Sequence, residues 1–255
     1  MKNAVNSFID SVAEKSPDSS IAIVKFAGKK NDKLGNDTYR EDGDTYNYSQ
    51  IVMNLTTVAS GQAALKSAVN SFSPGGATAA DYGMQYAQKI ISGAENDGRK
   101  KVVIMFTDGE PTYGSTFQKE VANNAISASK SIKDAGATVY TIGVFSGAKG
   151  TPVDDLSGLS QTNKYMHLVS SNYKNATNMD NPGTATYPEP KREKSYFLSA
   201  GSAGELNSIF QKISEEVGGS TTELDATSVI KDVVTPYFDM PENAEDVKLY
   251  TAESN

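Results

Sequence analysis

Two segments of the sequence place oxygen-bearing side chains beside strong turn signals. In the later one, residues 102–106 (VVIMF) are apolar and are followed by Thr107-Asp108-Gly109-Glu110-Pro111. A short apolar run bounded by turn residues is typical of a strand buried on both faces. Such a strand places Asp108 at its carboxyl end, the edge where open α/β sheets bind ligands. A carboxylate there suits a hard cation; the alternative is that Asp108 only caps the next helix or shapes the turn.

The earlier segment offers a hydroxyl group. Pro74-Gly75-Gly76 is a strong turn signal. Residues 79–91 then have a helical pattern, with apolar residues at spacings of three and four. Thr78 therefore lies where this helix should begin. Either its hydroxyl caps the helix, or the Gly-rich loop presents that oxygen as a metal ligand or outer-shell group.

The elements that must position these residues alternate between strand and helix. Strands are predicted over residues 20–28, 51–56, 102–106, 137–145 and 196–199, and helices over 1–13, 62–72, 79–91, 117–135 and 203–217. This alternation predicts an α/β fold with right-handed parallel crossovers. Segments 29–48 and 146–195 are predicted to be long loops, the first of them solvated. His167, the single histidine, lies in an apolar stretch that is interpreted as a strand with a structural histidine.

The two turn segments together resemble the von Willebrand factor type A (vWA) domain of Gram-positive surface and pilus-tip adhesins. Residues 75–78, followed by Gly83 and Met84, resemble the Thr loop of the family's metal-ion-dependent adhesion site (MIDAS). Residues 106–111 resemble its Asp loop. The resemblance covers residues 1–217. It implies a doubly wound, mostly parallel, Rossmann-like sheet with helices on both faces, and it implies Thr78 and Asp108 as ligands of Mg²⁺, or of Mn²⁺ or Ca²⁺. Neighbouring residues are predicted to lie on the ligand rim, namely Gly76, Glu110, Pro111 and Tyr113.

One part of the family's metal site has no counterpart. No Asp-x-Ser-x-Ser loop precedes the first predicted helix, which starts at the N-terminus with Val5, Phe8, Ile9 and Val12 on one face. We therefore expect a truncated chain that lacks its first strand and three of the family's five site residues, with Met1 an internal methionine. That strand would bury apolar side chains worth about 8–15 kcal/mol, comparable with the net stability of a whole domain. Metal binding by this chain should accordingly be weak or absent.

Beyond the predicted vWA domain the composition changes. Residues 218–223 are predicted to form a Gly/Ser/Thr-rich linker. Residues 224–255 are too few for an independent core. They loosely resemble the start of the immunoglobulin-like β domains that follow vWA domains in surface proteins. The alternative is a C-terminal tail docked on the main domain.

Composition excludes several classes of function. The net charge of -7 argues against nucleic-acid binding. No apolar run reaches the 18 residues that suggest a membrane span. The absence of cysteine excludes disulfides, thiol nucleophiles and Cys-ligated zinc. With one histidine and no Gly-x-Ser-x-Gly, P-loop or Gly-x-Gly-x-x-Gly motif, the sequence favours a protein that is not an enzyme.

These observations favour a metal-dependent adhesion module. The resemblance implies that a Mg²⁺ ion held by hydroxyls and few carboxylates stays electron-poor and completes its shell with a carboxylate of the partner. The resemblance implies a host or extracellular-matrix protein, or another surface protein, as that partner. It implies a location at the cell surface, secreted and anchored to the cell wall. An alternative is an intracellular vWA scaffold in a multiprotein complex of the chelatase ATPase type; a third is a metal-dependent phosphate-ester hydrolase, which lacks an obvious base.

Overall fold

The computed structural model describes residues 1–27, 38–41, 44–47, 49–72, 74, 76–187 and 194–218, with backbone alone for 38–41 and 44–47 and for the end of the last helix. The chain divides into two units, Met1–Gly219 and Ser220–Asn255. The second unit lies outside the described residues. The predicted linker beyond Gly218 and the predicted immunoglobulin-like start over 224–255 therefore stay predictions.

Helices and strands alternate along the described part of the first unit. In chain order they are α1 (Lys2–Lys15), β1 (Ser20–Lys25), β2 (Thr38–Glu41), β3 (Asp44–Asn47), β4 (Gln50–Thr57), α2 (Val58–Asn70), α3 (Ala80–Gly93), β5 (Val102–Thr107), α4 (Lys119–Asp134), β6 (Thr138–Gly143), α5 (Gln161–Val169), a 3-10 turn (Ser171–Tyr173), β7 (Phe197–Ser199) and α6 (Ala203–Gly218).

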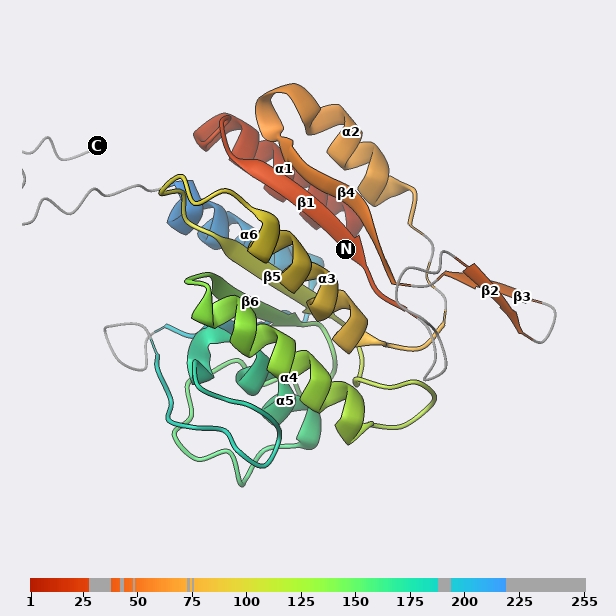
Figure 1. Cartoon of the computed structure of the whole chain (residues 1–255), viewed down its shortest axis with the longest axis vertical. Coiled ribbons are helices and arrows are strands. Elements are labelled where there is room, and N and C mark those ends of the chain that lie inside the picture. The colour runs from red at the N-terminus through yellow and green to blue at the C-terminus, as the bar shows by residue number, and fades with distance from the viewer. Residues whose placement is uncertain are drawn as a thin grey trace, which may run out of the picture. The chain divides into compact units, whose positions relative to one another are not determined.

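The centre of the fold is a parallel sheet with the strand order β5-β6-β7. Buried apolar residues of α3, α4 and α5 pack with Met105 and Val139 on one face. Residues of α1 and α6 pack with Tyr140 and Ile142 on the other, so helices cover both faces (Figure 1). The α/β fold with a parallel sheet, predicted from the alternation of elements, is confirmed, as are the helices on both faces that the family resemblance implied.

Two predictions about local structure were wrong. Segment 29–48 was predicted to be a solvated loop, yet β2 and β3 pair within it as an antiparallel hairpin. The signal for this was the Asp42-Gly43 dipeptide, which favours two-residue hairpin connections. The stretch around His167, within the predicted long loop 146–195, was predicted to be a strand, yet it lies in the helix α5. The Ser160 side chain caps this helix by accepting the backbone N–H of Asn163, and short apolar runs alone do not separate the two structures.

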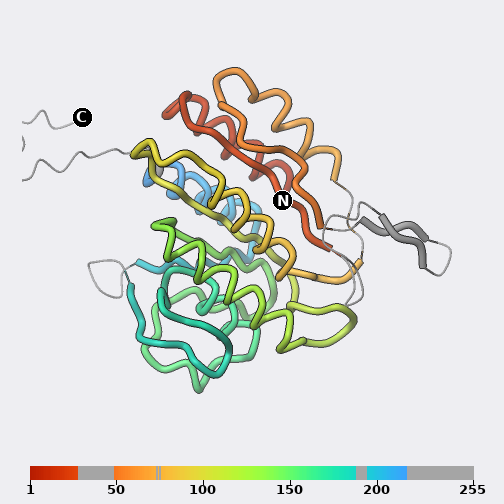
Figure 2. The backbone as a smooth tube through the Cα atoms, viewed as in Figure 1, coloured from red at the N-terminus to blue at the C-terminus, as the bar shows by residue number. Residues whose placement is uncertain are grey.

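The strands β1 and β5 do not pair with each other. Among the described strands, β1 pairs with β4 alone in an antiparallel sheet, and β5 pairs with β6 alone. In Figure 2 the chain runs from β1, β4 and α2 at one side, through α3 and β5, to β6 and α5 at the other. All of β1 and much of β5 are only half-buried, whereas β6 is buried over residues 139–143. Each of the two strands thus has one backbone edge without a partner among the described strands.

We expect this open arrangement to make the 255-residue chain marginally stable. Unpaired amide and carbonyl groups along apolar strands promote association, so the chain should bind a hydrophobic dye and aggregate at modest concentration. A longer chain that supplies an apolar strand for this position should lose both properties. A sharp, cooperative thermal transition above about 60 °C for the 255 residues would contradict this expectation.

A buried lysine fastens α5 to α4. Lys133 is 2% exposed, and its Nζ donates to the carbonyl oxygens of Leu168, Val169, Ser170 and Tyr173 at 3.0–3.4 Å. Burial lowers the pKa of Lys133 to about 7, while the four carbonyl dipoles oppose this by favouring the ammonium form. The lysine thereby supplies the donors that the carboxyl end of α5 needs.

Replacing Lys133 should show the value of this contact. Lys133→Met keeps the bulk but leaves the carbonyls at the end of α5 without donors, which should lower the free energy of unfolding by about 2–3 kcal/mol. Lys15→Met is the control, because that lysine pairs at the surface with Glu215, at 3.1 Å, and the change should alter stability by less than about 0.5 kcal/mol. Urea denaturation of both variants measures the difference; equal effects would show that Lys133 has no special role.

Candidate functional site

The Asp108 loop begins where the central sheet ends. β5 finishes at Thr107, whose hydroxyl accepts the backbone N–H of Gly109 at 3.2 Å. Asp108 is exposed, and its carboxylate makes no hydrogen bond or ion pair with any described residue. The turn is therefore stabilised by Thr107 and not by Asp108, which leaves the carboxylate oxygens available.

The side-chain oxygen of Thr78 does not cap the helix that follows it. α3 has Ala79 as its N-cap residue and no side-chain cap, so the capping alternative for Thr78 is not what the structure shows. The carbonyl of Thr78 accepts the backbone N–H groups of Ala80 at 2.9 Å and Thr112 at 3.0 Å. Its hydroxyl, within the described part of the chain, has no hydrogen-bond partner. Gly76 precedes it with a φ of 72°, a left-handed conformation that favours glycine.

The structure brings these two segments together. A methyl group on Gly109 would lie 3.4 Å from Thr78 Oγ1, so the hydroxyl lies against the residue next to Asp108. The hydrogen bond from Thr112 N–H to the Thr78 carbonyl joins the same segments. A hydroxyl and a carboxylate, both without partners, are the kind of hard oxygen donors that Mg²⁺ and Mn²⁺ bind. Among the described residues, no group of three or more His, Cys, Asp or Glu side chains could hold a metal ion.

The residues predicted for the ligand rim differ in their exposure and in their hydrogen bonds. Glu110 is exposed, and its Oε1 accepts a hydrogen bond from Thr162 Oγ1 at 3.3 Å. Pro111 is buried, and its carbonyl accepts the backbone N–H of Gln118 at 2.8 Å, so its ring is not a surface feature. Tyr113 is half-buried, with its ring centroid 6.2 Å from that of Tyr82.

The sequence did not reveal Asp81, a buried carboxylate in the first turn of α3. Asp81 is 1% exposed, and its Oδ2 accepts a hydrogen bond of 2.5 Å from the Tyr113 hydroxyl. Burial raises the pKa of Asp81, and hydrogen bonds from the Tyr113 hydroxyl, the Tyr82 backbone and the Asn124 side chain oppose that rise. Its place three residues after Thr78, in a helix's first turn, is the only signal, and it indicates no more than a favourable helix charge.

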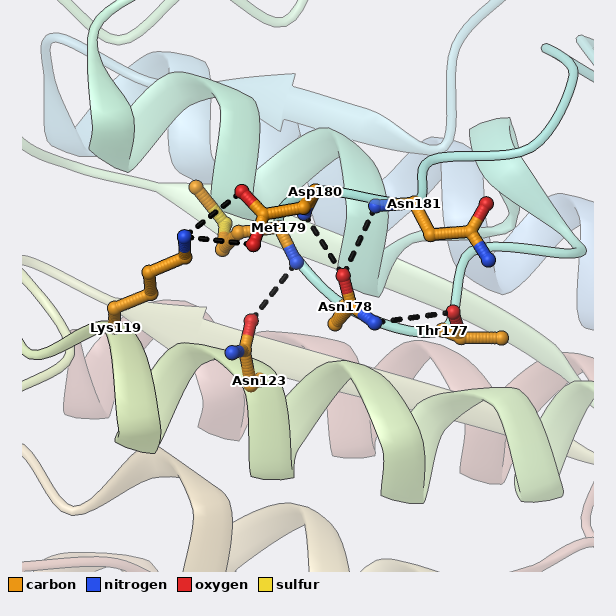
Figure 3. Close-up of polar contacts among 7 residues, drawn as sticks. All are labelled: Lys119, Asn123, Thr177, Asn178, Met179, Asp180 and Asn181. Atoms are coloured by element: carbon orange, nitrogen blue, oxygen red, sulfur yellow. Dashed lines mark hydrogen bonds and ion pairs between the residues drawn. The ribbon is translucent and has the colours of Figure 1, made fainter.

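The tip of the long connection after α5 lies against the start of α4 (Figure 3). Asp180 pairs with Lys119, the first residue of α4, at 2.7 Å, and Asn123 Oδ1 accepts the Met179 N–H at 2.8 Å. The turn itself is held by Asn178, whose Oδ1 accepts the N–H groups of Asp180 and Asn181, each at 2.9 Å. α4 begins after the Asp108 loop, so these contacts fix the helix start next to that loop.

His167 is a structural residue away from these segments. It is fully buried, Asn172 Nδ2 donates to its Nδ1 at 3.0 Å, and its Nε2 therefore donates to the Lys149 carbonyl at 3.1 Å. The ring also packs edge-on against Phe197, with centroids 5.0 Å apart. Burial lowers the pKa of His167 to about 4.

The depressed pKa of His167 predicts acid sensitivity. Since the folded pKa of about 4 lies below the unfolded value of 6.5, the unfolded chain binds more protons between these values. The His167 contribution to stability is thus complete above pH 6.5 and is lost as the pH falls towards 4, by about 3 kcal/mol. His167→Gln should be less stable at pH 7 but lose less free energy of unfolding between pH 7 and 4.5. Parallel pH profiles for the two proteins would contradict this.

Comparison with known proteins identifies the family. Residues 1–186 match the von Willebrand factor type A domain profile. The chain therefore belongs to the von Willebrand factor type A family, as predicted from residues 75–78 and 106–111. No curated protein sequence matches it. None of the helices in the described part is long and apolar enough to cross a membrane.

Solved pilus proteins share the fold. The pilus adhesin SpaC of Lactobacillus rhamnosus GG aligns with a TM-score of 0.54 at 17% identity, over 85% of this chain and 27% of SpaC. The vWF domain of the type V pili tip protein Mfa5 of Porphyromonas gingivalis aligns with a TM-score of 0.52 at 13% identity, over 85% of this chain and 86% of that domain. At these identities the likeness shows the fold alone. The chain spans little more than a quarter of SpaC, 27%.

Proposed function

We propose that this vWA domain is a metal-dependent protein-binding module in which Thr78 Oγ1 and the Asp108 carboxylate are two ligands of a Mg²⁺-type cation. The observation that carries the proposal is that these oxygens lie on adjoining segments and that neither has a partner among the described residues. At such positions a threonine hydroxyl commonly caps the helix, and an aspartate carboxylate commonly accepts a backbone hydrogen bond within the turn.

The chemistry of such a site favours capture of a carboxylate. Mg²⁺ takes six oxygen ligands in a near-octahedral shell and seldom receives all of them from one protein. One carboxylate and one hydroxyl leave much of the ion's charge unneutralised, so an Asp or Glu of the partner is a strong further ligand. The N-terminus of α3 beside Thr78 adds a partial positive charge that also favours this anion.

The biological setting proposed is adhesion at a bacterial surface. The family membership and the fold shared with two pilus proteins support this setting. The proposed partner is a host or extracellular-matrix protein, or another surface protein, and the whole protein would be secreted and anchored to the cell wall. We propose binding and not catalysis, because the single histidine is fully buried in a structural network away from Thr78 and Asp108.

Manganese titration followed by NMR tests the cation site directly. Paramagnetic Mn²⁺ should broaden the amide signals of residues 76–81 and 108–113 first, with a dissociation constant of roughly millimolar, since few ligands are available. Asp108→Ala should abolish the local broadening. Asp134→Ala is the control, because that carboxylate pairs with Lys130 at the far end of α4. Broadening elsewhere, or full affinity in Asp108→Ala, would refute the site, and a micromolar constant would refute the expected weakness.

A second arm addresses the partner. A longer chain that carries an Asp-x-Ser-x-Ser loop upstream should bind Mn²⁺ more tightly, and a short peptide containing Asp or Glu should then bind only when the metal is present. The same peptide with Asn or Gln in place of the acid is the matched control. Equal binding of both peptides, or binding that survives chelation with EDTA, would contradict recognition through a metal-bound carboxylate.

A further inference from the structure

The contact between Asp81 and Tyr113 joins two parts of the chain that the cation site needs together. Asp81 belongs to the first turn of α3, directly after Thr78 and Ala79, whereas Tyr113 closes the segment that begins with Asp108. Their side chains meet in a hydrogen bond of 2.5 Å across a sequence separation of 32 residues. The bond is charge-assisted whenever Asp81 is ionised, and such bonds are among the shortest and strongest in proteins.

This bond is partly buried, because Asp81 lies in the interior and Tyr113 is half-buried. Asp81 is 1% exposed, so loss of the Tyr113 hydroxyl would take a hydrogen-bond donor from a buried carboxylate, which costs free energy. The Tyr113 ring is confined from the side by Tyr82, with 6.2 Å between the centroids. A tyrosine held at its hydroxyl and along its ring has little freedom to swing outward.

The backbone hydrogen bonds of the loop lie on either side of Tyr113. Thr112 N–H donates to the Thr78 carbonyl at 3.0 Å, and Gln118 N–H donates to the Pro111 carbonyl at 2.8 Å. The Thr112 bond is the backbone link between the two proposed ligand segments, and Tyr113 is the next residue along the chain. Release of the tyrosine would therefore act first on the Thr112 bond.

We infer that Asp81 and Tyr113 form a positioning pair that holds the Asp108 loop against the start of α3 and so keeps Asp108 next to Thr78. The consequence for cation binding rests on the proposed function, whereas the effect on the loop does not. The pair also limits what the rim offers to a partner. The Tyr113 hydroxyl is occupied by Asp81, which leaves the ring as the part of this residue that a partner can contact.

Tyr113→Phe is the decisive variant, because it removes one hydroxyl oxygen and keeps the ring. We expect hydrogen exchange of the Thr112 amide to become faster in the metal-free protein, and Mn²⁺ to broaden residues 76–81 and 108–113 only at about tenfold higher concentration. Tyr196→Phe is the matched control, since it removes the same oxygen from another half-buried tyrosine, whose ring packs against Tyr140 of β6, and it should leave both measurements as in the wild type. Urea midpoints of all variants report stability separately.

Two changes at Asp81 separate hydrogen bonding from charge and from packing. Asp81→Asn retains an oxygen that accepts from Tyr113, so it should stay within about twofold of wild-type Mn²⁺ affinity and retain slow exchange at Thr112. Asp81→Ala should behave as Tyr113→Phe does. If Tyr113→Phe shifts only the urea midpoint, or changes nothing, the positioning role is overturned. If the wild type shows no local Mn²⁺ broadening while Thr112 exchange still accelerates in Tyr113→Phe, the pair positions the loop and the proposed cation site fails.

Discussion

The parallel pairing of β5 with β6 is the constraint on which the rest of the structure depends. The ladder runs in register from Val102↔Thr138 to Thr107↔Gly143, and Val144 N–H extends it by donating to the Thr107 carbonyl at 3.0 Å. Every backbone group of β5 that faces β6 is thereby used up to the last residue of the strand. Asp108 is the first residue beyond the ladder, so its position is set by a rigid element and not by the loop that follows.

The edges of the two sheets differ in how far the chain covers them. The free edge of β7 is covered by the chain at Gly150, where a methyl group would lie 2.5 Å from the Phe197 carbonyl oxygen. Glycine is required at this close approach, and the result is an edge shielded from other strands. The facing edges of β1 and β5 have no such cover from a described strand.

The sequence predicted the elements whose signal is local, and it failed where distant residues decide. The buried strands and the long amphipathic helices carry their periodicity within themselves, so β5, β6, α3, α4 and α6 were predicted to within a few residues. The sequence left open whether the Thr78 hydroxyl caps the helix, because the sequence pattern of a helix start is the same in both cases. In the structure the N-cap residue is Ala79, so Thr78 does not cap the helix. Asp81 was missed because its role depends on a hydrogen bond from Tyr113, 32 residues away in the sequence. The helix α5 was missed because nine residues are too few to show a helical period.

What distinguishes the candidate site is how the hydrogen bonds are shared between backbone and side chains. In the segments around Thr78 and Asp108, the carbonyls of Thr78 and Pro111 and the amides of Gly109 and Thr112 all have partners within the protein. Among the described residues, the Thr78 hydroxyl and the Asp108 carboxylate have none. Because these backbone groups already form hydrogen bonds, the backbone need not rearrange when a ligand binds. Little conformational entropy would therefore be lost on binding. The loop is thus ordered by its main chain and by the Asp81–Tyr113 bond, while its two side-chain oxygens remain available for an ion.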